Sequence, residues 1–349
     1  MTKLSDSTSA PVIEVREVSR SFQSVQKKPG FRGALGLLFR PEKTVHEALK
    51  KVSFSIEPGS FNGLIGANGA GKTTLLKILS GLIPPTAGEA RVLGYEPFLR
   101  SIEFRHQIAL VMGQKAQLWW DLPAVDAFDL LRAIYEVPLP IYRERLELLA
   151  ELLDVKRHLH TQIRRLSLGE RMKMELIGAL LHWPKVIFLD EPTIGLDVLA
   201  AHKLREFLRE FNLREKATII LTSHNMEDIE RLCSRVLILR SGELIYDGEP
   251  TGLTGKEERR LRIRFLQRPS LDELSECAGI PKEQIHFTHG TEAESLAAHL
   301  SVRQGQIVPI LQRLFARFQV VDMGLEEQTL EAVIQRLYEQ DRIQGDSRP

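Results

Sequence analysis

Short apolar segments separated by helical periodicities dominate roughly the first 250 residues. Residues 12–22 and 48–56 alternate between apolar and polar positions, which is typical of half-buried strands. The nearly continuous apolar runs at 185–190 and 217–224 predict strands that are buried on both faces. Since apolar strands that alternate with helices indicate a parallel sheet, we predict one α/β domain over residues 12–252.

A helical block interrupts this pattern. Apolar residues recur at helical spacing within 124–135, 141–153 and 169–181. The strand pattern returns only at residue 185. We therefore predict a helical subdomain of about residues 115–183 that is inserted into the sheet.

A second, smaller domain is predicted after a linker at 252–255. Residues 256–349 show the succession strand, helix, two strands, helix and strand, which a closing helix at 326–338 completes. The order βαββαβ is that of a ferredoxin-like unit. We expect an accessory or regulatory α+β domain, and our hypothesis for its role is stabilisation of a dimer or regulation.

Two segments near the N-terminus have patterns of their own. Residues 1–11 lack the apolar core of a signal peptide and predict a flexible tail. Residues 27–43 are basic and place apolar side chains at the spacing of an amphipathic helix. Such a helix can lie at a membrane surface or against a partner, whereas a loop packed on its own domain explains the pattern equally well.

Composition narrows the class of protein. The 349 residues include 47 Lys and Arg against 46 Asp and Glu, so overall charge gives no argument for nucleic-acid binding. The two cysteines, Cys233 and Cys277, cannot form a disulfide framework or a cysteine metal cluster, which suits a reducing cytosol. No apolar run approaches the roughly 20 residues of a membrane-spanning helix.

The strongest chemical signal lies at residues 66–73, whose sequence GANGAGKT matches the G-x-x-x-x-G-K-[ST] pattern of a P-loop. An apolar strand precedes the segment and a helix follows it, as a P-loop requires. Glycines let backbone amides close around phosphate, Lys72 can reach the β- and γ-phosphates, and the Thr73 hydroxyl can bind Mg²⁺. The predicted ATP-binding residues of this segment are Gly66, Ala67, Asn68, Gly69, Ala70, Gly71, Lys72, Thr73 and Thr74.

Polar side chains follow the other predicted strands, and ligands bind beyond the carboxyl ends of such strands. Asp190 and Glu191 end one buried strand, where Asp190 can hold Mg²⁺ and Glu191 can act as the general base. His224 ends another and can donate to the γ-phosphate, while Gln114 follows the strand at 107–113 and can contact the attacking water or Mg²⁺. Each residue alone can be an ordinary structural or loop residue, but together they predict one shared site.

The segment LSLGE at residues 166–170 opens a predicted helix. Ser167 and Glu170 form the S-x-x-E pattern of a capping box. The same geometry presents amides and a hydroxyl to an anion, so a cap and an anion-binding role can both hold.

In combination, several segments resemble ATPases of the ATP-binding cassette (ABC) transporter family in their order and spacing. They are GANGAGKTT, Gln114, LSLGE, VIFLDE, IGLD at 194–197 and TSH at 222–224. The resemblance covers residues 12–250. It implies a P-loop NTPase fold, a RecA-like core with an inserted helical subdomain, and it implies ATP and Mg²⁺ as cofactors.

The resemblance also implies a head-to-tail homodimer. In such a dimer each ATP lies between the P-loop of one chain and LSLGE of the other, so Ser167 and Gly169 would bind ATP in trans. Asp197 would lie in the D-loop, which couples the two sites. Phe22 matches the aromatic residue that stacks on adenine, although a core position explains it as well.

Four positions depart from the family pattern. Leu168 and Glu170 stand where LSGGQ has a glycine and a glutamine. Val198 replaces the proline that commonly follows the D-loop aspartate, and Phe22 lacks the hydroxyl of the usual tyrosine. None of these changes removes a catalytic group, so we expect an active ATPase.

The insert and the C-terminal domain resemble bacterial exporter-type members, whose permease is a separate chain. We expect ATP-driven export of an unknown substrate, with the protein held at the cytoplasmic face of the cell membrane by that permease and only indirectly in contact with the membrane surface. The expected permease contact lies near Gln114 and includes Leu118, Trp119 and Trp120. Core packing explains either Trp equally well.

The alternative is a soluble ABC-type ATPase that acts on ribosomes or nucleic acid. Such proteins resemble tandem cassettes in one chain or a cassette split by long coiled coils. This sequence has one P-loop, no heptad array and no strong basic tail. We therefore expect no nucleic-acid partner.

Overall fold

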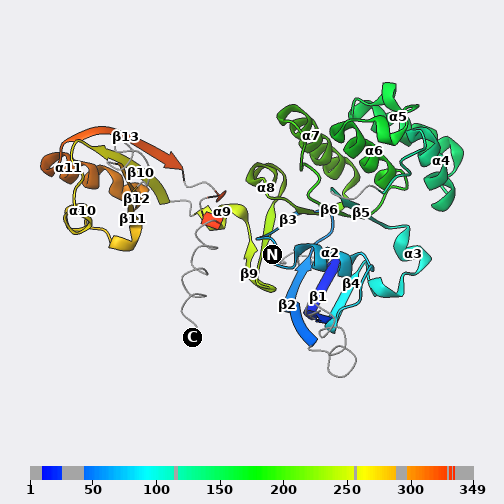
Figure 1. Ribbon diagram of the computed structural model, residues 1–349, viewed down its shortest axis with the longest axis horizontal. Coiled ribbons are helices and arrows are strands. Elements are labelled where there is room, and N and C mark those ends of the chain that lie inside the picture. The colour runs from blue at the N-terminus through cyan, green and yellow to red at the C-terminus, as the bar shows by residue number, and fades with distance from the viewer. Residues whose placement is uncertain are drawn as a thin grey trace, which may run out of the picture. The chain divides into compact units, whose positions relative to one another are not determined.

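The structure, a computed structural model, describes residues 10–25, 43–113, 117–254, 258–287, 297–327, 330–331 and 333–334. It divides into two compact units, Met1–Gly248 (unit 1) and Glu249–Pro349 (unit 2). Figure 1 shows the elements of both units. Most of the predicted tail at 1–11, nearly all of the insert at 27–43, Gln114 and most of the predicted closing helix at 326–338 lie outside the described residues.

The boundary between the units differs from the predicted linker. It falls between Gly248 and Glu249, before the segment at 252–255. Pro250–Thr254 forms the short helix α9. The two glycines of the segment favoured a linker, but Gly252 fits a single helical turn, in which its amide donates to the carbonyl oxygen of Glu249 at 3.0 Å.

A six-stranded sheet forms the centre of unit 1, in the order β5-β6-β7-β3-β8-β9. All neighbouring pairs are parallel except β8 and β9, which are antiparallel. Nearly every residue of β6 and every residue of β7 is buried, which explains their continuous apolar runs. The strands are β3 (Phe61–Gly66), β5 (Ile108–Met112), β6 (Val186–Asp190), β7 (Thr218–Thr222), β8 (Arg235–Arg240) and β9 (Glu243–Gly248).

An antiparallel sheet in the order β2-β1-β4 shares its hydrophobic core with the larger sheet. The core includes Ile13 of β1, Leu49 of β2, Leu76 of α2 and Phe188 of β6, each at most 1% exposed. The helix α2, which follows the P-loop, is therefore buried within this core. The elements introduced here are β1 (Ile13–Val25), β2 (Lys43–Ile56), β4 (Ala87–Val92) and α2 (Lys72–Leu79).

Three helices gather into one group within unit 1, as Figure 1 shows. They are α4 (Ala124–Ile134), α5 (Leu139–Leu152) and α6 (Leu168–Leu180). All three lie within the range in which the sequence predicts the inserted helical subdomain.

The other helices of unit 1 are α3 (Ile102–Arg105), α7 (Val198–Glu215) and α8 (Met226–Leu232). Ser167, Asp197 and Asn225 cap α6, α7 and α8 by accepting a backbone hydrogen bond. Within the described ranges, no helix combines the length and apolar character needed to cross a membrane. Short 3₁₀ helices lie at Pro97–Leu99, Lys156–His158 and Ile163–Arg165, and in unit 2 at Lys282–Gln284 and Gln304–Gln306.

Unit 2 contains a four-stranded antiparallel sheet in the order β11-β12-β10-β13. Its core includes Ile263, Leu274, Leu300 and Leu314, none of them more than 1% exposed. The element order is βαββαβ, and assignment to the ferredoxin-like fold stays a prediction based on that order. The elements are β10 (Glu258–Phe265), α10 (Leu271–Ala278), β11 (Ile285–Phe287), β12 (Ala297–Arg303), α11 (Ile307–Arg317) and β13 (Val320–Glu327).

Two leucines of this sheet give a matched test of the core of unit 2. Leu300 is fully buried, whereas Leu325 is 54% exposed. Leu300→Ala should lower the free energy of unfolding of unit 2 by about 2–5 kcal/mol because it leaves a cavity. Leu325→Ala should change it by less than about 0.5 kcal/mol. Amide hydrogen exchange over 258–287 measures both effects, and equal protection in the two variants would contradict this core.

Candidate functional site

The P-loop connects β3 to α2, and close backbone contacts restrict it to glycine at several positions. Gly69 and Gly71 have φ angles of +83° and +107°, which residues with a side chain rarely adopt. A Cβ atom on Gly71 would lie 2.5 Å from the carbonyl oxygen of Ala48. A Cβ atom on Gly66 would lie 2.6 Å from the carbonyl oxygen of Leu239. The path of the loop therefore depends on its glycines.

A cleft of about 490 Å³ opens over the P-loop. It is lined by Ala67, Asn68, Gly69, Ala70, Gly71, Lys72, Thr73 and Thr74, together with Phe22, His46, Ala48 and Glu191. Phe22 is 39% exposed, and the guanidinium carbon of Arg20 lies 4.7 Å from the centroid of its ring. The structure thus brings the predicted adenine-stacking residue and the predicted phosphate-binding loop to one cleft.

His46 lines the same cleft and was not predicted. It lies opposite Phe22 in the pairing of β1 with β2. Knowledge of this register is needed to place it, because a single histidine in a strand carries no local signal. The pairing of the two strands is therefore what adds His46 to the site.

Lys72 is only 6% exposed. Its Nζ donates to the carbonyl oxygens of Gly66 at 2.6 Å and Ala67 at 3.3 Å. Burial lowers the pKa of Lys72, while the negative charges of Glu191 and Asp190 act in the opposite direction. An ammonium group held at the base of this cleft is suited to bind a phosphate.

Hydroxyl groups hold both oxygens of the Asp190 carboxylate. Thr73 Oγ1 donates to Oδ2 at 2.9 Å, and Thr222 Oγ1 donates to Oδ1 at 2.7 Å. A carboxylate beside a hydroxyl at the P-loop fits Mg²⁺, which commonly takes one or two carboxylates and completes its shell with phosphate and water oxygens. Gln114, the third predicted ligand, lies outside the described residues. The contribution of Thr222 was not predicted.

Glu191 and His224 meet beside this carboxylate. Nε2 of His224 lies 2.8 Å from Oε1 of Glu191. The backbone amide of Glu191 donates to the carbonyl and hydroxyl oxygens of Thr222, at 3.1 Å and 3.0 Å. Glu191 has a φ angle of +55°, a strained value of the kind that persists where the surroundings over-determine the backbone. The structure thus brings the predicted base and the predicted sensor into direct contact.

Ser167 and Gly169 are not among the residues that line the cleft. Ser167 and Glu170 form the predicted capping box, and Ser167 Oγ also donates to Glu170 Oε2 at 2.8 Å. Hydrogen bonds from the amide and hydroxyl of Ser167 lower the pKa of Glu170. His158 Nε2 contacts the other carboxylate oxygen of Glu170 at 3.0 Å. The glutamate that replaces a glutamine here is therefore engaged in a local network.

The LSLGE segment packs against the predicted D-loop of its own chain. A Cβ atom on Gly169 would lie 3.7 Å from Leu196, and one on Gly195 would lie 2.5 Å from Leu168. Asp197 caps α7 by accepting from the amide of Ala200 at 2.8 Å. Apolar side chains remain exposed around this contact, namely Leu168 (37%), Ile194 (40%), Val198 (84%) and Leu199 (63%).

Comparisons with known proteins agree with this geometry. The sequence profile of the family described as "ABC transporter" matches residues 49–194. The "ABC transporter ATP-binding protein NatA" of Bacillus subtilis (strain 168) is 33% identical over 210 residues, which are 60% of this chain and 85% of that protein. This chain belongs to the ABC transporter family. Its fold is therefore that of the P-loop NTPase cassettes, and its activity is ATP hydrolysis with ATP and Mg²⁺.

Two further comparisons concern a relative and a solved structure. The "Nod factor export ATP-binding protein I" of Paraburkholderia xenovorans (strain LB400) is 36% identical over 216 residues, which are 62% of this chain and 69% of that protein. A structure titled "Structure of ATP binding subunit of ABC transporter" superposes with a TM-score of 0.57 at 27% identity and covers 69% of this chain and 91% of its own. These names do not favour the alternative of a soluble ATPase acting on ribosomes or nucleic acid.

The surface expected to contact a permease is only partly as predicted for this ABC ATPase. Trp119 and Trp120 are 44% and 50% exposed, and the guanidinium carbon of Arg171 lies 5.3 Å from the centroid of the Trp120 ring. Leu118 is 5% exposed, so its inclusion in the contact surface was wrong. Its side chain packs against α6, where a Cβ atom on Gly178 would lie 3.1 Å from Leu118 Cδ2, and Glu175 of the same helix accepts its backbone amide at 3.2 Å.

The buried ammonium of Lys72 gives the first prediction for nucleotide binding. Lys72→Ala should weaken ATP binding by about 2–5 kcal/mol, roughly 30-fold or more, because the phosphates lose their buried cationic partner. Lys77→Ala on the same helix is the control, since Lys77 does not line the cleft. Titration with a fluorescent ATP analogue measures both affinities. Equal affinities in the two variants would contradict the role of Lys72.

Proposed function

We propose that this ABC ATPase is the nucleotide-binding subunit of an exporter. Two copies close head-to-tail around ATP, and hydrolysis reopens the homodimer. Cytoplasmic loops of a separate membrane permease carry that motion across the bilayer. The permease holds the protein at the cytoplasmic face of the cell membrane, and contact with the membrane surface is indirect.

The position of the LSLGE segment is the observation that carries this proposal. Ser167 and Gly169 are absent from the lining of the cleft, although both belong to the described residues. Gly169 lies instead against Leu196 and Ala200, in a segment where Val198 is 84% exposed. The cleft therefore lacks two of the proposed phosphate-binding residues, Ser167 and Gly169. These two residues lie instead on a surface with exposed apolar side chains, which supports closure of the site by a second copy.

The side chains around the cleft divide the work of binding. P-loop amides and Lys72 bind the phosphates, and Phe22 stacks on adenine. Thr73, Asp190 and Gln114 would hold Mg²⁺, which would neutralise charge on the phosphates. The hydrogen bond of 2.9 Å from Thr73 Oγ1 to Asp190 Oδ2 supports this assignment because it places two of the proposed Mg²⁺ ligands side by side.

Hydrolysis is assigned to the residues beyond β6 and β7. Glu191 accepts a proton from the attacking water. His224 contacts that carboxylate through Nε2 at 2.8 Å, and it donates to the γ-phosphate when ATP is bound. Asp197 couples the two sites of the dimer through the D-loop. Export is supported by the name of the relative that is 36% identical, the Nod factor export protein.

Removal of the proposed base gives a direct test of the dimer. Glu191→Gln should bind ATP normally but hydrolyse it about 10²–10⁴-fold more slowly, because the proton acceptor is lost while the P-loop contacts remain. The ATP-bound dimer should then accumulate. Size-exclusion chromatography with MgATP should show a dimer of Glu191→Gln. A monomer with wild-type turnover would contradict both the base and the dimer.

A second substitution separates the interface from the site. In the Glu191→Gln background, Val198→Glu should prevent the dimer because it buries an unpaired charge. Leu213→Glu on the same helix α7 is the matched control, since Leu213 is 57% exposed and lies at the opposite end of the helix. ATP affinity should be equal in both. A dimer that persists with Val198→Glu would exclude this surface as the interface.

Trp119 and Trp120 test the contact with the permease. Replacing both by alanine should uncouple transport in reconstituted vesicles and leave basal ATPase activity within about twofold, because neither side chain lines the cleft. The membrane protein that co-purifies with the wild type serves as the permease. Unchanged transport by a normally assembled variant would reject this contact.

A further inference from the structure

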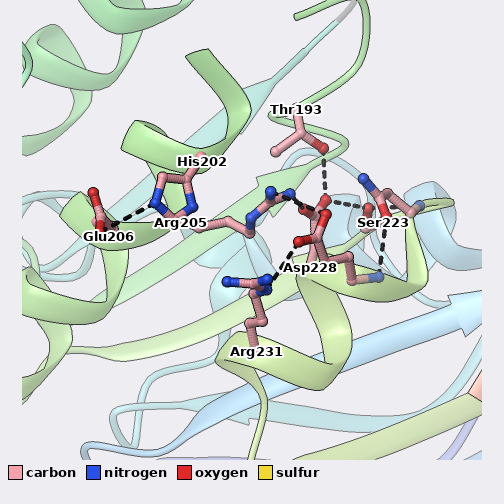
Figure 2. Close-up of polar contacts among 9 residues, drawn as sticks. Thr193, His202, Arg205, Glu206, Ser223, Asp228 and Arg231 are labelled. Carbon is pink, nitrogen blue, oxygen red and sulfur yellow. Dashed lines mark hydrogen bonds and ion pairs between the residues drawn. The ribbon is translucent and has the colours of Figure 1, made fainter. Parts of the chain in front are cut away.

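Asp228, in the first turn of α8, is fully buried and is the centre of a polar cluster. Its Oδ2 atom accepts hydrogen bonds from Thr193 Oγ1 and Ser223 Oγ, both at 2.6 Å. Its Oδ1 atom accepts a hydrogen bond from Arg205 Nη1 at 2.8 Å. Figure 2 shows these side chains converging on one carboxylate. We name Thr193, Arg205, Ser223 and Asp228 the Asp228 cluster.

The Asp228 cluster joins the two segments that carry the proposed catalytic pair. Thr193 follows Glu191 by two residues, and Ser223 directly precedes His224. The contact between Glu191 and His224 is therefore flanked by two hydroxyls that donate to the same oxygen of Asp228. Loss of that shared acceptor would therefore leave the two segments free to move relative to each other.

Arg205 supplies the positive charge that a buried carboxylate requires. It is 4% exposed, and its Nη2 atom also contacts Glu227 Oε2 at 3.1 Å. Glu227 is held in turn by Arg231 Nε at 2.9 Å. Arg205 lies on α7, the helix that Asp197 of the D-loop caps. The Asp228 cluster is thus connected to the coupling segment through a single helix.

The segment after Glu191 depends on such an anchor. Glu191 has a φ angle of +55°, which is unfavourable for a residue with a side chain. The turns that follow are closed by long backbone hydrogen bonds, from Ile194 N to Glu191 O at 3.3 Å and from Leu196 N to Thr193 O at 3.2 Å. The hydrogen bond of 2.6 Å from Thr193 Oγ1 to Asp228 Oδ2 connects this turn to α8.

We propose that Asp228, held by Arg205, is a positioning residue for ATP hydrolysis. It sets the relative orientation of Glu191 and His224 through the hydroxyls of the Asp228 cluster. The inference rests on the proposed roles of Glu191 and His224 in hydrolysis. All four cluster residues are described, and none of them lines the cleft over the P-loop. The cluster therefore acts on turnover of bound ATP and leaves ATP affinity unchanged.

Hydroxyl-deleting variants test this inference better than substitution of Asp228, which would leave Arg205 buried without its partner. Thr193→Val removes one hydroxyl and keeps the shape of the side chain. It should lower kcat at saturating MgATP about tenfold, because a small misplacement of a catalytic group is costly. ATP affinity should stay within about twofold, and Thr193→Ser, which restores the hydroxyl, should recover most of the activity.

A control variant comes from α7, the helix that carries Arg205. His202 and Glu206 form an i,i+4 contact on the exposed side of α7, with Nε2 and Oε1 at 3.3 Å. Figure 2 shows this pair beside Arg205. His202→Ala removes a polar contact from α7 without touching either catalytic segment, so its kcat should remain within about twofold of the wild type. Thermal melting of every variant verifies that the fold is retained.

A double variant shows whether Thr193 acts through Glu191. In the Glu191→Gln background, Thr193→Val should cause no further loss of the residual hydrolysis rate. Wild-type kcat in Thr193→Val, equal losses in Thr193→Val and Thr193→Ser, or a loss confined to ATP affinity would each overturn the inference. If Glu191→Gln itself turns over ATP at the wild-type rate, the proposed base fails, and the inference that rests on it fails for that separate reason.

Discussion

The parallel pairing of β6, β7 and β3 is the interaction on which the candidate site depends. The register places Asp190 level with Thr222 and Thr222 level with Leu64, so the ends of three strands meet at one edge of the sheet. A shift of one residue would reverse the direction of every side chain and turn the carboxylate away from the P-loop. Phe188 and Ile220, at most 1% exposed, resist that shift because it would force their side chains into closely packed space that fits other residues. The apolar strands therefore determine the geometry of the polar site.

Much of this site could be predicted because a change from apolar to polar residues marks the end of each strand in the sequence. The change from continuous apolar residues to Asp190-Glu191, and the His224 that follows β7, mark positions at which parallel strands gather functional groups. The capping box of Ser167 and Glu170 is confirmed. It could be predicted because both of its hydrogen bonds join residues that are three apart in the sequence. Signals of this kind are local, or they repeat at the end of each strand.

Contacts between distant segments carry no such signal. His46 reaches the cleft only because it pairs with Phe22 across two strands. Leu118 was expected at the surface but turns inward, where Glu175 accepts its backbone amide from 57 residues away. An acidic residue in the first turn of a helix is ordinarily explained by the helix dipole. Nothing local reveals that Asp228 is fully buried against an arginine 23 residues earlier.

The burial of a charged pair in the Asp228 cluster calls for a reason other than stability. Removing two charges from water costs several kcal/mol per ion, and well-packed apolar residues often replace such pairs without loss. A carboxylate offers directional acceptors that an apolar side chain lacks. Oδ2 of Asp228 binds hydroxyls from two segments at 2.6 Å each and so fixes their separation, while Arg205 satisfies the opposite oxygen. ATP binding depends on the backbone path of the P-loop, which glycines dictate. Alignment of the proposed base and sensor depends instead on the directional hydrogen bonds of Asp228. The buried hydroxyl and charged groups of the Asp228 cluster supply these hydrogen bonds.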